Sequence, residues 1–270
     1  MSAITSPEDS VRAGQLTHAL QQLQSRVRAR PADAKDRVFL FQLLALLGQW
    51  DRAVAQLDVA AELDPAALML KQIYRQAVAA EAARSRVFDG EATPLVMGEP
   101  APWVALFLEA QRLTGGGHAA KGAELRTQAL DEAPTRSGSI NGERFEWIAD
   151  ADSRLGPCIE IIADGQYMWA PFERVRSLKM EAPTDLRDLV WTAAIITWEN
   201  GGQTPALIPT RYPGAERQDD DELRMARRTE WRAEGETYIG AGQRMLATDA
   251  GEYPLLEIRE VLFDADGASA

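Results

Sequence analysis

The residues best suited to chemistry lie in the second half of the chain. Cys158 is the single cysteine, and a thiolate nucleophile needs a base close by. No histidine follows His118, so a Cys–His pair would have to join the two halves of the chain. Cys158 also lies in the apolar run Cys-Ile-Glu-Ile-Ile, where a buried and unreactive thiol is the usual case. We therefore assign no catalysis to Cys158.

Neighbouring carboxylates occur at two places. Asp150 and Asp152 are two positions apart, and Asp219-Asp220-Asp221-Glu222 forms an acidic run. The run lacks the alternating oxygen ligands and the bend-forming Gly of a calcium loop. We interpret it as a solvated loop before a helix over 222–228, where acidic residues favour the helix start. Asp150 and Asp152 are predicted to hold turns through hydrogen bonds to the local backbone.

The remaining candidate motifs are weaker. Gly115-Gly116-Gly117 lacks the Lys-Ser/Thr that follows a phosphate-binding loop and does not follow a strand. His18 and His118 have no second ligand residue at metal-binding spacing. The sequence therefore predicts no catalytic residues, no metal and no cofactor.

One enzymatic hypothesis stays open as the alternative. Polar sequence motifs cluster in the predicted loops of the second half, and loops often carry functional residues. A small-molecule enzyme there would use Asp150, Asp152, Arg211 or Arg244 around a pocket lined by tryptophans. Five of the seven Trp residues lie in this half: Trp147, Trp169, Trp191, Trp198 and Trp231.

The first half has an internal repeat. The residues Gly14, Leu16, Ala19, Leu23 and Pro31 recur 34 positions later as Gly48, Trp50, Ala53, Leu57 and Pro65. This is the tetratricopeptide period, in which small and aromatic positions let paired helices pack and Pro ends the second helix. Another step of 34 from Trp50 reaches Arg84, so the next unit is degenerate.

The helical pattern predicts a short solenoid of about three hairpins. Helices are expected over 40–47, 67–88, 103–113 and 119–132, with a loop over 93–102. Leu16, Leu23, Trp50 and Leu57 are predicted to pack inside. Such solenoids offer a concave groove to peptides or helices. The candidate partner-binding residues on the first helices are Phe41, Leu44, Trp103 and Phe107.

The second half reads as strands joined by tight turns. Asp164-Gly165, between 158–163 and 166–169, is a strong hairpin signal because a type I′ turn needs positive φ at both positions. Asn200-Gly201 predicts another reversal, between 191–198 and 203–208. Further strands are expected over 174–180 and 255–263, with a helical turn around 185–189. A small polar linker at 135–139 separates a helical domain, 1–138, from an antiparallel β-rich α+β domain, 139–270.

Charge distribution narrows the classes of partner. The net charge is −12, of which −1 falls in 1–138 and −11 in 139–270. A surface of that sign repels phosphate, so nucleic acids and anionic membranes are not expected as partners. No segment is long and apolar enough for a membrane helix, and the first 30 residues lack a signal-peptide pattern. With a single cysteine, a reducing cytoplasmic location is expected.

Several phrases together carry a resemblance to a known family. They are F-E-W-I-A-D-A-D-S-R-L-G-P at 145–157, D-G-Q-Y-M-W-A-P-F at 164–172, L-R-D-L-V-W at 186–191, P-T-R-Y-P-G at 209–214, R-R-T-E-W at 227–231 and G-A-G-Q-R at 240–244. On these phrases the chain resembles the ImpE/SciE family, also called TagJ, of type VI secretion accessory proteins. With the helical repeat, the resemblance covers nearly the whole chain.

The resemblance implies a cytoplasmic, non-enzymatic adaptor. Such an adaptor would bind the N-terminal helix of the small sheath subunit and act near the ClpV ATPase, which disassembles contracted sheaths. The resemblance brings no catalytic residues. A purely structural assembly scaffold is a third hypothesis, which differs from the adaptor in what is bound and when.

Overall fold

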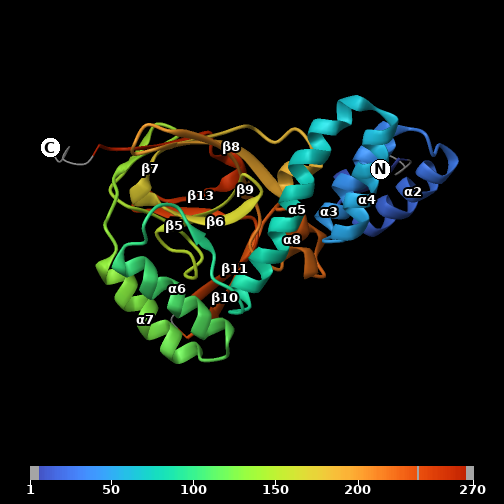
Figure 1. Ribbon diagram of the computed structural model, residues 1–270. Coiled ribbons are helices and arrows are strands. Elements are labelled where there is room, and N and C mark those ends of the chain that lie inside the picture. Colours follow the sequence, from blue (N-terminus) through green and yellow to red (C-terminus); the bar gives the residue numbers. More distant parts are fainter. Residues whose placement is uncertain (1–5, 236, 266–270) are drawn as a thin grey trace.

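The computed structural model describes residues 6–235 and 237–265, in which a group of helices is followed by a sheet-rich part (Figure 1). The helices are α1 Pro7–Arg12, α2 Leu16–Ala29, α3 Ala34–Leu46, α4 Trp50–Leu63, α5 Leu68–Phe88, α6 Pro102–Gly115, α7 Ala119–Glu132 and the short α8 Asp221–Arg224. Single 3₁₀ turns are η1 Pro65–Ala67, η2 Phe172–Arg174, η3 Leu186–Leu189, η4 Ala215–Arg217 and η5 Leu255–Glu257.

The first helices begin and end at residues suited to those positions. Ser6 accepts a hydrogen bond from Asp9 N at 3.1 Å and caps α1, and Asp33 caps α3 in the same way. Gly48 follows α3 with φ +66, the left-handed conformation that ends many helices. Consecutive helices α3 and α4 then pack side by side, as do α6 and α7.

The repeat positions are buried as the 34-residue pattern predicts, with one exception. Leu16, Leu23 and Leu57 are fully buried. Trp50 is only half-buried and lies against Trp191 of the sheet, with ring centroids 5.9 Å apart. The helical pairs are present where expected, and their assignment as tetratricopeptide units stays a prediction.

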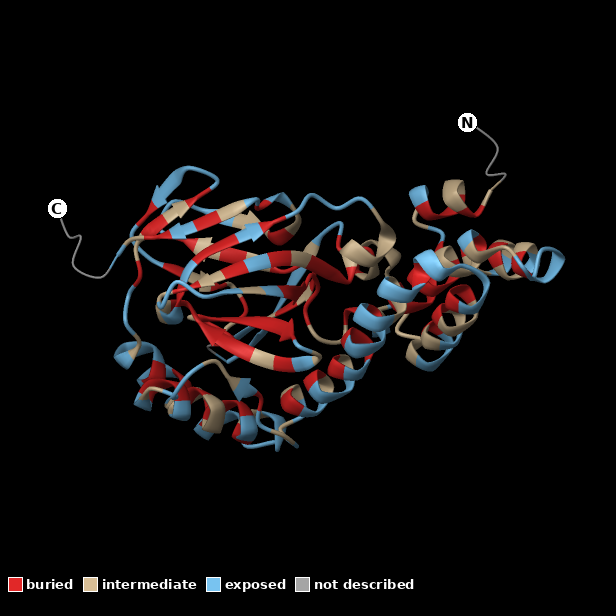
Figure 2. Ribbon diagram, turned by 45° about the horizontal axis from the view of Figure 1, so that its top comes forward, coloured by how far each residue is buried: buried red, intermediate tan, exposed pale blue. Residues whose placement is uncertain are grey.

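Helix α5 connects the two parts of the molecule. Its 21 residues run from the α2–α4 group along the sheet (Figures 1 and 2). The helix predicted over 67–88 is thus confirmed. In a regular repeat it would be followed by an antiparallel partner helix, but here it continues onto the sheet. The α6–α7 pair lies farther along the same side of the molecule (Figure 2).

The strands form one large and two small sheets. They are β1 Leu95–Val96, β2 Gly138–Ile140, β3 Glu143–Phe145, β4 Ile148–Asp150, β5 Cys158–Ala163, β6 Gln166–Pro171, β7 Val175–Met180, β8 Trp191–Trp198, β9 Gln203–Pro209, β10 Thr229–Glu234, β11 Thr237–Gly242, β12 Met245–Thr248, β13 Glu252–Pro254 and β14 Glu260–Phe263. Among the described residues the large sheet has the order β1-β6-β5-β9-β8-β7-β14-β2-β3, and the small ones are β13-β12-β4 and β10-β11.

The predicted turns are correct and some boundaries are not. Asp164 and Gly165 have φ of 50 and 74, and they join β5 to β6 in an antiparallel hairpin. The expected reversal after Asn200 joins β8 to β9. The strand expected over 255–263 is wrong in its first part, because Leu255–Glu257 forms a 3₁₀ turn after Pro254. The sheet also contains one parallel pair, β1 with β6, which the antiparallel prediction missed.

Two hydrophobic cores lie on the two faces of the large sheet. One joins the sheet to the helices and includes Trp169 and Trp191. The other lies against the β13-β12-β4 sheet and includes Ile196 and Phe263. The helical and β-rich parts therefore share a continuous core. No helix in the described ranges is long and apolar enough to cross a membrane.

Candidate functional site

The most charged part of the interior is centred on Glu160 of β5, whose side chain is fully buried. Arg84 of α5 donates from Nε and Nη2 to its two carboxylate oxygens at 2.7 and 3.0 Å. Tyr167 donates its hydroxyl to Glu160 Oε1 at 2.5 Å, and Trp169 Nε1 donates to that hydroxyl at 2.7 Å. The guanidinium group of Arg84 thus reaches from α5 into the core and neutralises the buried carboxylate of Glu160, which would be unstable without a cationic partner.

Arg244 connects this pair to a second carboxylate. Its guanidinium forms ion pairs with both Glu160 and Asp150, and its Nε donates to Pro209 O at 2.9 Å. Tyr212 donates its hydroxyl to Asp150 Oδ1 at 3.1 Å. Arg84, Arg244, Glu160 and Asp150 together carry no net charge, which is the condition under which buried charges are tolerated. We call these four residues with Tyr167 and Tyr212 the buried ion network.

Arg211 links the network to two helix ends. Its backbone carbonyl accepts from Arg84 Nη2 at 2.7 Å. Its own Nη1 donates to Leu46 O at 2.8 Å and to Arg224 O at 2.6 Å, the last residues of α3 and α8. A cation at a helix C-terminus satisfies free carbonyls and interacts favourably with the helix dipole. Burial lowers the pKa of Arg211 to about 10, so the side chain still carries its charge near neutral pH.

Asp152 holds the turn after β4. Its carboxylate accepts from Arg154 N and Nε at 2.9 Å each, from Arg154 Nη2 at 2.6 Å and from Gly240 N at 2.9 Å. Asp150 accepts from Asp152 N at 2.9 Å. The predicted turn-forming role of the Asp pair is confirmed, and Asp150 additionally belongs to the buried ion network.

The two carboxyls of the network have opposite pKa shifts. Burial would raise the pKa of Glu160, but the guanidinium groups of Arg84 and Arg244 outweigh it and lower the pKa to about 2. Burial raises the pKa of Asp150 to about 6; Arg244 opposes this rise, and the nearby Asp152 carboxylate adds to it. The ionised form of Glu160 is therefore the better stabilised of the two.

Cys158 is fully buried at the start of β5. Burial raises the pKa of its thiol well above the usual range, so the reactive thiolate is disfavoured at neutral pH. This agrees with the interpretation of Cys158 as an inert core residue.

The residues of the enzymatic hypothesis come together, but in the interior. Asp150, Asp152, Arg211 and Arg244 are each at most 3% exposed. Their carboxylate and guanidinium groups bind one another, neighbouring side chains and backbone. A substrate would have to displace these contacts to reach them. Trp169 and Trp191, expected to line a pocket, are likewise fully buried.

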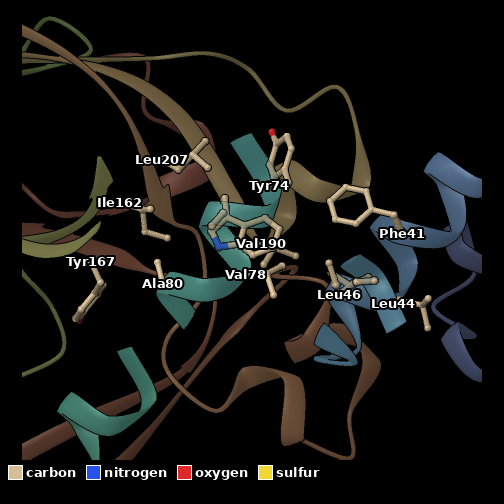
Figure 3. Packing of buried hydrophobic residues seen from close by; sticks show 14 of the residues in the cluster. Phe41, Leu44, Leu46, Tyr74, Val78, Ala80, Ile162, Tyr167, Val190 and Leu207 are labelled. Atoms are coloured by element: carbon tan, nitrogen blue, oxygen red, sulfur yellow. The ribbon is translucent and has the colours of Figure 1, made fainter. Parts of the chain in front are cut away.

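The four predicted partner-binding residues lie in the core, and Figure 3 shows two of them, Phe41 and Leu44. Phe41 is fully buried and packs on Tyr74 of α5, with ring centroids 5.6 Å apart, and Leu44 is 1% exposed. The surface of α3 that a partner would have used is covered by α5 and η3, since Leu186 N donates to Gln42 Oε1 at 3.0 Å.

The other two candidates are covered by the sheet. Phe107 packs on Trp169 at 6.4 Å between ring centroids and on Trp103 at 6.5 Å. Trp103 is 4% and Phe107 1% exposed. In this fold none of the four offers surface to a partner.

An apolar surface pocket of about 470 Å³ lies elsewhere, between α5 and the outer face of β5, β9, β8 and β7. We call it the sheet pocket. It is lined by Ile73, Tyr74, Gln76, Ile162, Asp164, Gly165, Lys179, Met180, Glu181, Ala193, Ala194, Ile195, Pro205, Ala206 and Leu207. Ile73 and Ile195 are each 41% exposed. The sequence prediction did not include these residues, because the pocket depends on how α5 lies on the sheet.

The acidic run at 219–222 belongs neither to the buried ion network nor to the sheet pocket. Asp220 caps α8 by accepting from Glu222 N at 2.7 Å, as an acidic residue at a helix start was predicted to do. The helix ends at Arg224 rather than 228, because Ala226 has φ 52, outside the right-handed helical region. No cluster of three His, Cys, Asp or Glu residues able to hold a metal occurs within 6–235 and 237–265.

Four of the six family motifs contribute residues in or beside the buried ion network. Asp150 and Asp152 come from the first phrase, Tyr167 and Trp169 from the second, Arg211 and Tyr212 from the fourth, and Gly240 and Arg244 from the last. These motifs therefore supply residues around the Arg84–Glu160 pair, which attaches α5 to the sheet. The chain belongs to the ImpE family, whose model, described as ImpE protein, matches residues 142–262.

Individual relatives support the same assignment. The chain is 48% identical over 261 residues to the type VI secretion system accessory component TagJ of Pseudomonas aeruginosa, covering 97% of this chain and 92% of that protein. The crystal structure of protein VPA1032 from Vibrio parahaemolyticus has the same fold, with a TM-score of 0.86 and 24% identity, over 98% of this chain and 99% of that one. The family match and the relative of 48% identity confirm the resemblance to the ImpE family.

Proposed function

We propose that this protein is a cytoplasmic, non-enzymatic adaptor of a bacterial type VI secretion system. It binds the N-terminal helix of the small sheath subunit and assists ClpV-dependent disassembly or recycling of the sheath. The observation that carries the proposal is the 48% identity, over 97% of the chain, to a type VI secretion accessory component. At that identity and coverage the relative is similar throughout both the helical and the β-rich parts.

The distribution of polar groups supports an adaptor over an enzyme. The titratable residues that family phrases bring together are buried and bound to one another, which favours a structural role for them. The exposed sheet pocket is mainly apolar, as binding surfaces for protein segments often are. We also propose that the α1–α4 pairs are divergent tetratricopeptide units, which agrees with the buried repeat positions Leu16, Leu23 and Leu57.

The test uses the small sheath subunit of the type VI secretion system from the same organism. Calorimetric titration of the full chain with the intact subunit, and with the subunit lacking its N-terminal helix, separates helix capture from other contacts. We expect binding of the intact subunit and no measurable binding of the truncated one. Equal binding of both, or of neither, contradicts the proposal. Adding ClpV to the intact complex then tests the second contact.

A further inference from the structure

We infer that the sheet pocket, extended along α5 by Met69, is the docking surface for an amphipathic α-helix with basic residues at its edges. The inference rests on the proposed function, because it places the contact that the adaptor needs. It differs from the groove expected on α3 and α6, whose candidate residues are buried.

The floor of the pocket is an uncovered part of a sheet. Ile195 lies on β8, which has β7 on one side and β9 on the other, and its side chain is 41% exposed. Farther along the sheet, Trp169 of β6 is covered by Phe88 and Phe107 and is fully buried. The helices thus cover the β5–β6 side of this face and leave an apolar strip open over β7–β9. An open apolar strip of this kind marks a binding surface.

Helix α5 continues the apolar surface beyond the sheet. Met69, Ile73 and Gln76 follow one another at four- and three-residue spacing, so they share one face of the helix. Ile73 and Gln76 line the pocket, while Met69 is 67% exposed. Methionine adapts its shape to different apolar partners and is frequent on surfaces that bind helices. The occupant therefore lies along α5 as well as on the strands.

The position of the pocket favours a helix over an extended peptide. Its floor is made of β5, β9, β8 and β7, each with strands on both sides. The central strand β8 is paired along its length with β7 and β9, so its backbone groups already have partners within the sheet. An extended peptide lying on them would gain no backbone hydrogen bonds, and buried backbone groups need partners. A helix satisfies its own backbone and presents an apolar face. The strip from β5 to β7 is about 14 Å wide at normal strand spacing, which fits one helix.

Acidic residues at the edge, or rim, of the sheet pocket favour a positively charged partner. Asp164 borders the pocket on the β5 side and Glu181 on the β7 side, and within the described part of the chain neither carboxylate has an ion-pair partner. Lys179, the one lysine of the lining, is already paired with Glu260 at 3.4 Å. The rim is therefore left with two free negative charges. Lysine or arginine residues flanking the apolar face of a partner helix complement them.

The first experiment titrates a synthetic peptide of the small subunit's N-terminal helix, and the intact subunit, into variants of the full chain. Ile195→Asp and Ile73→Asp change exposed residues of the pocket, so the fold should remain. Each should weaken binding at least about tenfold, as loss of a central apolar contact does. The matched control is Leu262→Asp, because Leu262 is 42% exposed on β14 of the same sheet and outside the pocket.

The outcomes separate the inference from the proposed function. If the wild-type chain binds neither probe, the proposed function fails. If it binds both and the two pocket variants bind as tightly as Leu262→Asp, the location in the sheet pocket is wrong. If the wild-type chain forms a dimer that Ile195→Asp abolishes without any probe, the pocket is a self-association surface and the inference is overturned.

A charge reversal tests the rim. Glu181→Lys should weaken binding several-fold and reduce its dependence on salt, because one attraction becomes a repulsion. The control is Glu252→Lys, an exposed change on β13 away from the pocket. Equal effects of the two changes would contradict a basic partner at this rim.

A labelling experiment reports contact directly. Because Cys158 is the single cysteine and is fully buried, Ile195→Cys introduces the one accessible thiol of the chain. The helix peptide should slow maleimide labelling of that thiol at least about tenfold at saturation, since the bound fraction is protected. The same peptide should leave labelling of Leu262→Cys unchanged. Unslowed labelling at position 195 in the saturated complex contradicts the inference.

Discussion

Arg84 and Glu160 show how two residues without a recognisable motif can organise a fold. Each residue departs from the sequence pattern around it, the 34-residue repeat for Arg84 and the apolar strand for Glu160. Arg84 stands where another 34-residue step from Trp50 would place an aromatic or apolar residue. Glu160 is the one charged residue of β5, all of whose residues are buried. Each exception signals a buried charge, but neither indicates its partner, because the partner lies 76 residues away.

Removing one side of this pair should be strongly destabilising. Arg84→Ala is expected to lower the free energy of unfolding by about 3–5 kcal/mol, since it leaves Glu160 with fewer partners in a dry interior. Arg84→Lys should recover only part of the loss, because an ammonium cannot bind both carboxylate oxygens in parallel. Denaturant titration measures both.

The control has similar geometry at the surface. Arg112 binds Glu109 through two contacts of 2.7 Å, but the side chains are 55% and 45% exposed. Arg112→Ala should therefore change stability by no more than about 1 kcal/mol. Similar losses in the two alanine variants would mean that burial does not strengthen the Arg84 contact.

Asp150 leads to a pH-dependent prediction. Its pKa is raised to about 6 in the fold from a usual value of 3.8, so the protonated form is the one that folding favours. The resulting stabilisation is present below about pH 4 and is lost as pH rises through 6. Relative to Asp150→Asn, the wild-type free energy of unfolding should fall by about 3 kcal/mol across that interval. A difference that stays constant with pH would show that Asp150 is ionised throughout.

Elements with local signals were predicted well. The β5–β6 and β8–β9 hairpins follow from Asp-Gly and Asn-Gly, whose residues tolerate positive φ, and their strand ranges match closely. Helices α6 and α7 follow from periodicity and glycine punctuation. The sequence prediction missed β2–β4, β10–β13, the parallel β1–β6 pair and the 3₁₀ turn at Leu255–Glu257, because tertiary contacts rather than propensity decide them.

The glycines of β11 explain one family phrase physically. In G-A-G-Q-R, a Cβ at Gly240 would lie 2.3 Å from the Tyr212 ring, and one at Gly242 would lie 2.2 Å from Arg228 O. Gly242 also has φ +88. The phrase thus keeps β11 close to Tyr212 of the buried ion network.

Alanine substitutions at two glycines can separate the energetic cost of a positive φ from the cost of a steric clash. Gly201 and Gly242 have φ of +83 and +88, but a Cβ at Gly201 meets nothing within 4 Å. Gly201→Ala should cost about 1 kcal/mol from the left-handed conformation alone. Gly242→Ala should cost clearly more, because the backbone of Arg228 must also move. Thermal unfolding of both variants tests this, and equal losses would mean that the strand relaxes freely.

At the scale of the whole molecule, the helical and β-rich parts share one core. Trp191 packs on Trp50 and Tyr74, with ring centroids 5.9 and 5.6 Å away, and its Nε1 donates to Glu81 Oε1 at 2.9 Å. The sequence predicted both parts and a linker near 135–139, but not this contact. Amphipathic patterns show which faces are buried, without showing which faces meet.

The shared core predicts cooperative unfolding. Helical circular dichroism and tryptophan fluorescence should report the same transition in the wild-type chain, because the core that joins the helices to the sheet contains residues of both parts. Trp191→Ala should destabilise the protein by about 3–5 kcal/mol and separate the two transitions. The control is Trp198→Phe, which changes the opposite core. Separate transitions in the wild-type chain would contradict the prediction.

The long-range contacts of Arg84 and Arg211 also bear on how the chain is synthesised. Arg84 leaves the ribosome 76 residues before Glu160, and Leu46 leaves 165 residues before the Arg211 that binds its carbonyl. The helix faces that pack on the sheet therefore stay exposed until the strands and Arg211 have been synthesised. Proteins dominated by such non-local contacts fold slowly, and exposed intermediates aggregate. We therefore expect aggregation during synthesis to begin from chains in which the helical half has emerged and the sheet has not.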